Sequence, residues 1–336
     1  MIKIKKCITL AVAGLMLLSF TGCNIIERTP ESIGKTILGN VDGEKITRAD
    51  VDKLLTYQLT SYKEKYGEDF ENNTEIKETI KKTRTSALDN LISQKVLMNK
   101  KEDVGITLTD EEIQTQVDQQ IESIKTKAGT DEAFLKLLAQ YGYTEEEFQT
   151  YMKEQIILGA ISEKLVKDVT VTDEELQNYY KENLESLKIN PGATVTCIEF
   201  TDATKGEAQA KAARALSVSG KTFDQIKAME EYKDDESVTV QDLGHQDFEN
   251  NTKLPTAFVT AFKNLKVDEI SQPVQNNGWQ LIKNTVVNTE IITPTFEAVK
   301  TQVETTVLNQ KKEAEYQSKL EGFKAEMDIK TYNDKY

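Results

Sequence analysis

The sequence predicts an α+β protein in which a discontinuous, all-helical domain, made of N-terminal helices plus a C-terminal helix, carries an inserted α+β domain. Apolar residues recur at helical spacing over residues 39–190 and again over 290–329, whereas residues 193–287 mix β-rich and helical stretches. A single long helix cannot bury an apolar face by itself. We therefore expect the C-terminal helix to pack on the N-terminal helices.

The first residues predict export. Three lysines precede a mostly apolar stretch that ends at Gly22, with small residues directly before Cys23, as in a secretory signal peptide. This stretch is shorter than the roughly 20 apolar residues that a permanent membrane span needs. The Thr-Gly-Cys end resembles a bacterial lipobox, although Phe20 stands where such boxes usually carry Leu. We expect residues 1–22 to be a lipoprotein signal peptide, Cys23 to carry a diacylglyceryl anchor and residues 23–38 to form a tether. The alternative is a simple cleaved signal with an incidental cysteine.

Charge and residue counts exclude several classes of function. The chain has 42 basic and 56 acidic side chains, a net charge of −14, and removal of the three leader lysines makes it −17. A body this acidic is a poor partner for nucleic acid, and it stays soluble beside an anionic membrane to which a lipid holds it. His245 is the only histidine, and Cys197 is the only cysteine after Cys23. We therefore expect no disulfide in the mature body, no metal site and no cofactor.

Helix start signals recur through the N-terminal half. A strand and turn at residues 39–47, with Asp-Gly at the tip, lead into apolar stripes at 51–62 and 76–98. Three Thr-x-x-Glu sequences then mark helix N-termini as capping boxes, in which each side chain satisfies a free backbone amide. They are Thr109 with Glu112, Thr144 with Glu147, and Thr172 with Glu175. We interpret most of the apolar stripes behind them as an ordinary helical core.

The composition changes after Asn190-Pro191-Gly192, where β-rich segments begin to alternate with helical ones. The predicted segments are a strand at 195–200, helices at 207–216 and 220–226, a turn at Asp242-Leu243-Gly244, a helix at 254–265 and closing strand segments at 278–287. These segments predict a compact α+β unit. The helical pattern returns from residue 294 to residue 327.

These features together carry a family resemblance. The segment Gly39-Asn-Val-Asp-Gly-Glu-Lys-Ile-Thr47, leading into helices, resembles the N-terminal region of SurA-type and PrsA-type chaperones. Residues 193–287 are similar to a parvulin-type peptidyl-prolyl isomerase domain, through Gly220-Lys-Thr-Phe223, Asp242-Leu-Gly244 and Gly278-Trp-Gln-Leu-Ile-Lys283. The chain thus resembles the PrsA-type foldase lipoproteins over nearly its whole mature length. The resemblance implies one client-binding domain built from both ends of the chain. From the apolar stripes themselves we expect some apolar surface to stay exposed for clients.

The resemblance also locates candidate catalytic positions, and it shows where this chain departs from the family. Cys197 and Gln280 stand where the first and closing strands of the family usually carry histidine, and Asp234 matches the third polar position. Residues that would line the proline pocket are Leu254, Phe258 and Phe262. The single His245, after the predicted turn, is interpreted as a surface residue.

Two interpretations of the altered positions stay open. Peptidyl-prolyl isomerisation needs no nucleophile, because its barrier of about 18–20 kcal/mol falls when the amide loses conjugation. A weak activity is therefore compatible with Cys197, Asp234 and Gln280. The alternative is that these three residues are structural remnants, with the cysteine acting as a small buried hydrophobe.

The expected function is that of an extracytoplasmic, lipid-anchored foldase for secreted proteins, with the alternative of a non-enzymatic holdase. Expected partners are unfolded or newly secreted polypeptides and, through the lipid on Cys23, the outer face of the cell membrane. Nucleic acid is not expected, and a homodimer stays open. A solute-binding receptor is disfavoured, because such receptors need repeated βα units around a cleft and this chain has none.

Overall fold

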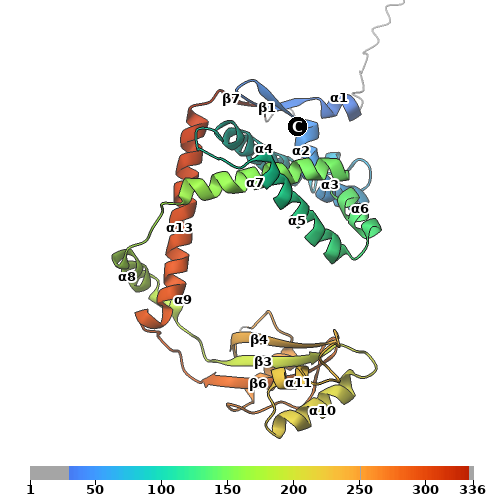
Figure 1. Ribbon diagram of the computed structural model, residues 1–336, viewed down its shortest axis with the longest axis vertical. Helices are drawn as coiled ribbons and strands as arrows, with labels where there is room; N and C mark the ends of the chain where they lie inside the picture. Colours follow the sequence, from blue (N-terminus) through green and yellow to red (C-terminus); the bar gives the residue numbers. More distant parts are fainter. Residues whose placement is uncertain (1–29, 250, 333–336) are drawn as a thin grey trace, which may run out of the picture. The chain divides into compact units, whose positions relative to one another are not determined.

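The computed structural model describes residues 30–249 and 251–332, so the predicted signal peptide, residues 1–22, and the predicted anchor residue Cys23 lie outside the described residues (Figure 1). The described chain divides into two compact units. The first runs up to Lys167 and resumes from Glu315, and the second spans Asp168–Ala314. Within these residues, no helix combines the length and the apolar character needed to cross a membrane.

The first unit is built mainly of helices whose starts follow local capping chemistry. Its helices are α1 (Pro30–Gly34), α2 (Arg48–Leu54), α3 (Thr56–Tyr66), the short 3-10 helix η1 (Phe70–Asn72), α4 (Lys77–Asn99), α5 (Asp110–Ala128), α6 (Asp131–Gln140) and α7 (Glu145–Val166). The capping boxes predicted at Thr109 and Thr144 are confirmed, since both reciprocal hydrogen bonds are present in each. A further box joins Thr47 to Asp50 at the start of α2.

The first unit also contains a small antiparallel sheet, so it is not entirely helical. Its strands are β1 (Ile37–Val41), β2 (Glu44–Thr47) and β7 (Ile329–Thr331), in the order β2-β1-β7. The β1–β2 hairpin turns at Asp42 and Gly43, both with positive φ, as the predicted Asp-Gly tip requires. Strand β7 is too short for its sequence to show an alternation of apolar and polar residues. It forms because β1 has a free edge with which the C-terminal segment can pair.

The C-terminal end of α13 (Phe296–Ala325) joins the core of the first unit. Leu320 is 4% exposed and lies in one apolar cluster with Leu38, Leu88 and Ile161. Leu38 is fully buried although residues 23–38 were predicted as tether, so the folded body begins before residue 39. Residues from both ends of the chain therefore share one core.

The second unit is an antiparallel four-stranded sheet with helices on both faces. Its elements are α8 (Asp173–Glu182), α9 (Leu184–Leu187), β3 (Gly192–Phe200), α10 (Gly206–Val218), α11 (Phe223–Lys227), β4 (Val238–Asp247), α12 (Thr256–Lys263), β5 (Val274–Gln275) and β6 (Trp279–Asn288). The strand order is β4-β3-β6-β5. Helices α10 and α11 pack on one face and α12 packs on the other.

The division between the units lies earlier in the chain than the predicted domain limit at residue 190. Leu176 of α8 packs with Val299 and Val303 at the start of α13. Lys311 of α13 also pairs with Glu175, the capping glutamate of α8, at 2.6 Å. Helices α8 and α9 therefore group with the second unit, because their apolar face is buried by the first half of α13.

The prediction of a turn at Asp242-Leu243-Gly244 is wrong, because these residues lie inside β4. Thr196 of β3 pairs with Asp242 and Val195 pairs with Gly244, which leaves Leu243 as the extra residue of a bulge. Asp242 Oδ1 accepts from the Gly244 amide at 2.9 Å, and Gly244 has a φ of 61°. The local turn chemistry is real, but the strand continues through it.

Candidate functional site

One face of the four-stranded sheet carries Cys197 at the centre of β3, between Gln241 on β4 and Ile282 on β6. Its side chain is 3% exposed and packs in an apolar cluster that includes Phe258 of α12. Burial, with a smaller contribution from Glu199, raises the pKa of the Cys197 thiol to about 12. The sulfur is therefore a protonated thiol at neutral pH and not a nucleophilic thiolate.

Gln280 lies on the same sheet face, opposite Glu199 in the β3–β6 ladder. Its Nε2 donates to Glu199 Oε1 at 2.8 Å, and Gln241 Nε2 donates to Glu199 Oε2 at 3.2 Å. Gln280 is 6% exposed, and its buried Oε1 has no hydrogen-bond partner among the described residues. A desolvated acceptor is therefore left on the face that carries Cys197.

Asp234 has no hydrogen bond or ion pair to these residues. It is exposed in the segment between α11 and β4. The neighbouring Asp235 organises that segment, because its carboxylate accepts from Ser237 Oγ at 2.6 Å and from Gln209 Nε2 at 3.2 Å. Of the three predicted catalytic residues, the structure thus places Cys197 and Gln280 on one face.

The three predicted pocket residues belong to the cluster around Cys197, but two of them are core residues. Phe262 is fully buried and Phe258 is 3% exposed, with the ring centroids 6.2 Å apart in an edge-on contact. Leu254, before α12, keeps partial exposure. Asn284 of β6 holds the end of α12 by donating to the backbone oxygens of Phe262 at 2.7 Å and Leu265 at 3.0 Å. A proline ring could touch both phenylalanines only if α12 moved.

This face offers hydrogen-bonding groups and apolar contacts but no nucleophile. Catalysis of amide rotation requires only contacts that favour the twisted amide over the planar one. The Glu199 carboxylate and the free Oε1 of Gln280 are the polar groups available beside the buried thiol. The sequence pattern does not single out Glu199, and its only signal is a charged residue inside the apolar run Ile198-Glu199-Phe200.

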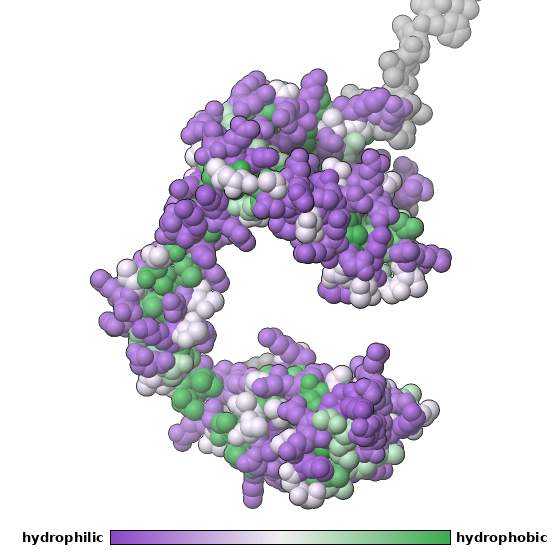
Figure 2. Space-filling view, in the orientation of Figure 1, coloured by the Kyte–Doolittle hydropathy of each residue, from purple (hydrophilic) through white to green (hydrophobic). Residues whose placement is uncertain are grey.

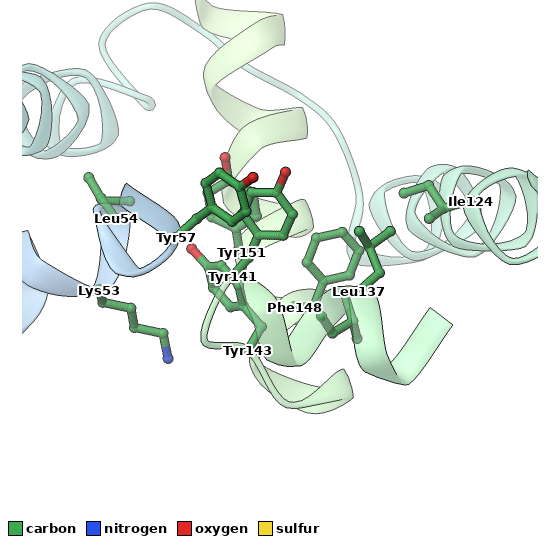
Figure 3. A pocket seen from close by; sticks show the side chains of 10 residues that line it. Lys53, Leu54, Tyr57, Ile124, Leu137, Tyr141, Tyr143, Phe148 and Tyr151 are labelled. Carbon is green, nitrogen blue, oxygen red and sulfur yellow. The ribbon is translucent and has the colours of Figure 1, made fainter. Parts of the chain in front are cut away.

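The first unit contains a hollow of about 310 Å³ walled largely by aromatic rings, which we call the aromatic hollow (Figure 3). Its rings are Tyr57 of α3, Tyr141 and Tyr143 of the loop before α7, and Phe148 and Tyr151 of α7. The Tyr57 and Tyr141 side chains are 57% and 49% exposed and stack with centroids 5.3 Å apart. Its aliphatic wall is formed by Leu54, Ile124, Leu137 and Leu138.

The aromatic hollow is open to solvent and apolar, which is unusual for a chain this rich in charge. Leu54 and Leu137 are 36% and 38% exposed, and apolar side chains, in green, reach the surface around α6 (Figure 2). Exposed apolar patches of this kind mark sites for ligands or other proteins. Tyr141 and Phe148 belong to the apolar stripes of the N-terminal half, most of which the sequence pattern predicted to be ordinary helical core. The signal that points to the hollow instead is the run Tyr141-Gly142-Tyr143 between two helices.

Close packing of the loop at Gly142 assembles the hollow. Gly142 has a φ of 77°, and a Cβ at this position would lie 2.7 Å from Oγ1 of Thr56. Thr56 is held in turn, because its Oγ1 donates to the backbone oxygen of Lys53 at 2.8 Å. Glycine is therefore required for the loop to approach the start of α3 and set Tyr141 against Tyr57.

A cation already lies at the edge of the hollow. Lys53 Nζ is 2.5 Å from Glu147 Oε1 and 5.0 Å from the centroid of the Tyr143 ring. Two hydrogen bonds to the Glu147 carboxylate, first the one from Lys53 and then the one from the Thr144 backbone amide, lower the pKa of Glu147. Burial first, and then the charges of Tyr151, Glu147 and Glu154, raise the pKa of Tyr143. The hollow therefore has an electronegative edge.

Among residues 30–249 and 251–332, no group of three or more His, Cys, Asp or Glu side chains is placed to hold a metal ion.

Two family models match the chain in the order of the two units. A SurA-like N-terminal domain matches residues 2–162, and a PPIC-type PPIase domain matches residues 171–301. The class that fold and site define is therefore a SurA-like chaperone domain joined to an isomerase-type domain.

Relatives match over nearly the full length. Foldase protein PrsA of Clostridium perfringens strain 13 is 31% identical over 100% of this chain and 97% of its own. Foldase protein PrsA of Clostridium acetobutylicum is 32% identical over 97% of this chain and 96% of its own. The chain belongs to the PrsA foldase family. A crystal structure of PrsA from Bacillus subtilis aligns with 23% identity and a TM-score of 0.38, over 86% of this chain and 92% of that chain.

Proposed function

We propose that this protein is an extracytoplasmic foldase that binds unfolded or newly secreted polypeptides and assists their folding. Its membership of the PrsA foldase family supports the proposal. The observation that carries it is the aromatic hollow, because unfolded chains expose the large apolar side chains that such a surface can bury. Folded proteins hide these side chains, so binding would end as the client folds.

We also propose that the chain is held at the outer face of the cell membrane by a diacylglyceryl group on Cys23, after removal of residues 1–22. The leader lysines, the apolar stretch and the Thr-Gly-Cys end support this. Metabolic labelling of cells with a radioactive fatty acid tests it. Label should enter the protein and be lost in Cys23→Ala, and a labelled Cys23→Ala protein would contradict the anchor.

For the second unit we propose weak peptidyl-prolyl isomerase activity on the sheet face that carries Cys197 and Gln280, with Asp234 as a third polar group. The match to a PPIC-type PPIase domain supports it. The pocket side chains would be Leu254, Phe258 and Phe262, which become accessible when α12 shifts.

A non-enzymatic holdase is the second candidate, and burial favours it. Phe258 and Phe262 are enclosed in the core, and the raised pKa of Cys197 keeps its thiol inert. In this case the second unit would act as a scaffold or binding module and would not catalyse isomerisation.

Two assays on the full chain separate these candidates. Suppression of aggregation of a denatured client measures holding, and acceleration of a proline-limited refolding phase, which otherwise takes tens of seconds or more, measures isomerisation. The double variant Tyr57→Ala/Tyr141→Ala should reduce holding, whereas Leu135→Ala, an exposed α6 residue outside the hollow, should not. Undiminished holding by the double variant would contradict the proposed site.

Gln280→Ala should slow refolding and leave holding intact if the isomerase proposal is right. If the unaltered chain does not accelerate the proline-limited refolding phase, the isomerase proposal fails and the holdase is the remaining candidate.

A further inference from the structure

A second hollow adjoins the aromatic hollow and changes the chemistry of the combined surface. It has a volume of about 380 Å³ and shares Lys53, Leu54, Tyr143 and Tyr151 with the aromatic hollow. Its remaining wall is largely polar. We call this second space the acidic hollow. All the lining residues belong to the first unit.

Carboxylates dominate the acidic hollow. Asp50, Glu146 and Glu154 line it and are exposed. Neither Glu146 nor Glu154 forms an ion pair with another described residue, and Asp50 accepts only from the backbone and hydroxyl of Thr47. Among the residues that line the two hollows, Lys53 is the only basic one. Its charge is already matched by Glu147, so the other three carboxylates are left without a cation.

The position of Lys53 shows how this surface holds a positive charge. Its ammonium group lies between a carboxylate and an aromatic face, at 2.5 Å from Glu147 Oε1 and 5.0 Å from the Tyr143 centroid. Cation–π contact and a carboxylate partner both favour an ammonium or guanidinium group here. Tyr151 belongs to the same surface and lies near Glu154 along α7, so a second cation can be bound by the same chemistry.

We propose that this composite groove selects client segments in which a large apolar or aromatic side chain stands next to lysine or arginine. The apolar side chain enters the aromatic hollow, and the basic one meets Glu146 and Glu154 in the acidic hollow. The occupant is an unfolded, positively charged polypeptide segment, favoured over a second copy of this chain because this chain carries a net charge of −14. The inference rests on the proposed foldase function and adds sequence selection to it.

The test is fluorescence anisotropy of the full chain with labelled, unstructured peptides of matched length. One peptide repeats Phe-Lys, the second Phe-Glu and the third Ala-Lys. The Phe-Lys peptide should bind about ten-fold more tightly than either of the others, and the preference over Phe-Glu should shrink as salt rises.

Variants assign the charge selection to the groove. Glu146→Gln/Glu154→Gln should bring the Phe-Lys affinity close to the Phe-Glu affinity. The matched control is Glu64→Gln/Glu78→Gln, two exposed glutamates of α3 and α4 outside both hollows, which should leave the preference unchanged. Glutamine at these surface positions should preserve the fold, and circular dichroism checks this.

Three results overturn the inference. Equal affinity for the Phe-Lys and Phe-Glu peptides removes charge selection, while binding of both leaves the foldase proposal standing. Absence of peptide binding together with intact suppression of client aggregation places client binding elsewhere. Self-association that Tyr57→Ala abolishes makes a second copy the occupant. If aggregation suppression is also absent, the proposed function fails together with the inference.

Discussion

Gln280 and Glu199 form a hydrogen bond across neighbouring strands, with Gln280 Nε2 donating to Glu199 Oε1 at 2.8 Å. The bond fixes which end of the Gln280 amide faces the carboxylate and leaves its Oε1 without a partner. In Glu199→Gln the charge-assisted bonds from Gln280 and Gln241 are lost, so the free energy of unfolding should fall by about 1 to 2 kcal/mol. Urea denaturation measures it. Glu236→Gln, at an exposed site, is the control, and an unchanged midpoint for Glu199→Gln would contradict the prediction.

The buried thiol of Cys197 should react with alkylating reagents only when the protein unfolds. In a chain that starts after Cys23, it should resist iodoacetamide under native conditions and react fully in denaturant, because it is 3% exposed and protonated. Mass spectrometry counts the adducts. Rapid native alkylation would show that the β3–α12 core opens readily.

The same thiol predicts a loss of stability at alkaline pH. Its pKa is raised from 9.0 in the unfolded chain to about 12 in the folded one, so its stabilising contribution is complete below pH 9 and is lost as pH rises toward 12. Tyr232, whose pKa burial likewise raises to about 12, acts in the same direction. Cys197→Ala should therefore flatten, but not abolish, the fall in unfolding free energy above pH 9. An identical slope in the variant would count against the thiol's contribution.

Arg84 links α4 to α2 and η1 through a buried ion network. Its guanidinium donates to Asp52 Oδ1 at 2.7 Å and to Glu71 Oε1 at 2.6 Å, with only 4% of its side chain exposed. Arg84→Ala should lower the free energy of unfolding by about 3 kcal/mol, because two partly buried carboxylates, Asp52 and Glu71, would then share Arg48 as their one remaining cation among the described residues. Lys63→Ala, which removes the exposed pair with Glu68, should cost less than about 1 kcal/mol. Equal losses in thermal unfolding would contradict this ranking.

The acid side of the stability profile should reflect Glu71. Burial tends to raise its pKa, but hydrogen bonds from Arg84 and Arg48 lower it below 4.5. Because the folded pKa is depressed, its stabilising contribution is present above pH 4.5 and is lost as pH falls through the folded value. Glu71→Gln should make the unfolding free energy less dependent on pH below 4.5. A profile parallel to that of the unaltered chain would refute the assignment.

Gly142 should be needed for the aromatic hollow. Gly142→Ala places a methyl group 2.7 Å from Thr56 Oγ1 at a positive φ, whereas Gly129→Ala introduces the same kind of backbone strain with nothing within 4 Å. Both should cost about 1 kcal/mol for the backbone, and only Gly142→Ala should also weaken client binding by separating Tyr141 from Tyr57. Tyrosine fluorescence and aggregation suppression measure the two effects. Equal client binding by both variants would remove the role assigned to the loop.

Leu320 tests the shared core of the two chain ends. It is 4% exposed and lies with Leu38 and Leu88, so Leu320→Ala should lower the free energy of unfolding by about 2 to 4 kcal/mol. Val218→Ala, at a side chain that is 63% exposed, should change it little. Deleting residues 315–336 should lower the unfolding temperature of the first unit further. If the deletion left that unfolding temperature unchanged, the conclusion that both ends of the chain form one domain would be wrong.

Most helices and strands were predictable because their signals are local. The box at Thr172 is an example, since its threonine and Glu175 satisfy each other's backbone amides within three residues. The turn residues at Asp42-Gly43 were predictable for the same reason. At Asp242-Leu243-Gly244 the local chemistry was present, but pairing with β3 turned it into a bulge, which a single strand's sequence does not reveal.

By itself, the sequence determined the order of elements, the acidic charge, the expected leader and the resemblance that placed Cys197, Gln280 and the pocket residues. Only the tertiary structure decided which side chains come into contact. Glu199 accepts a hydrogen bond from Gln280, 81 residues further along the chain, and Tyr57 stacks on Tyr141 across a similar stretch of chain. Contacts over such distances depend on how whole elements pack, and that packing is a collective result of burying every apolar face at once.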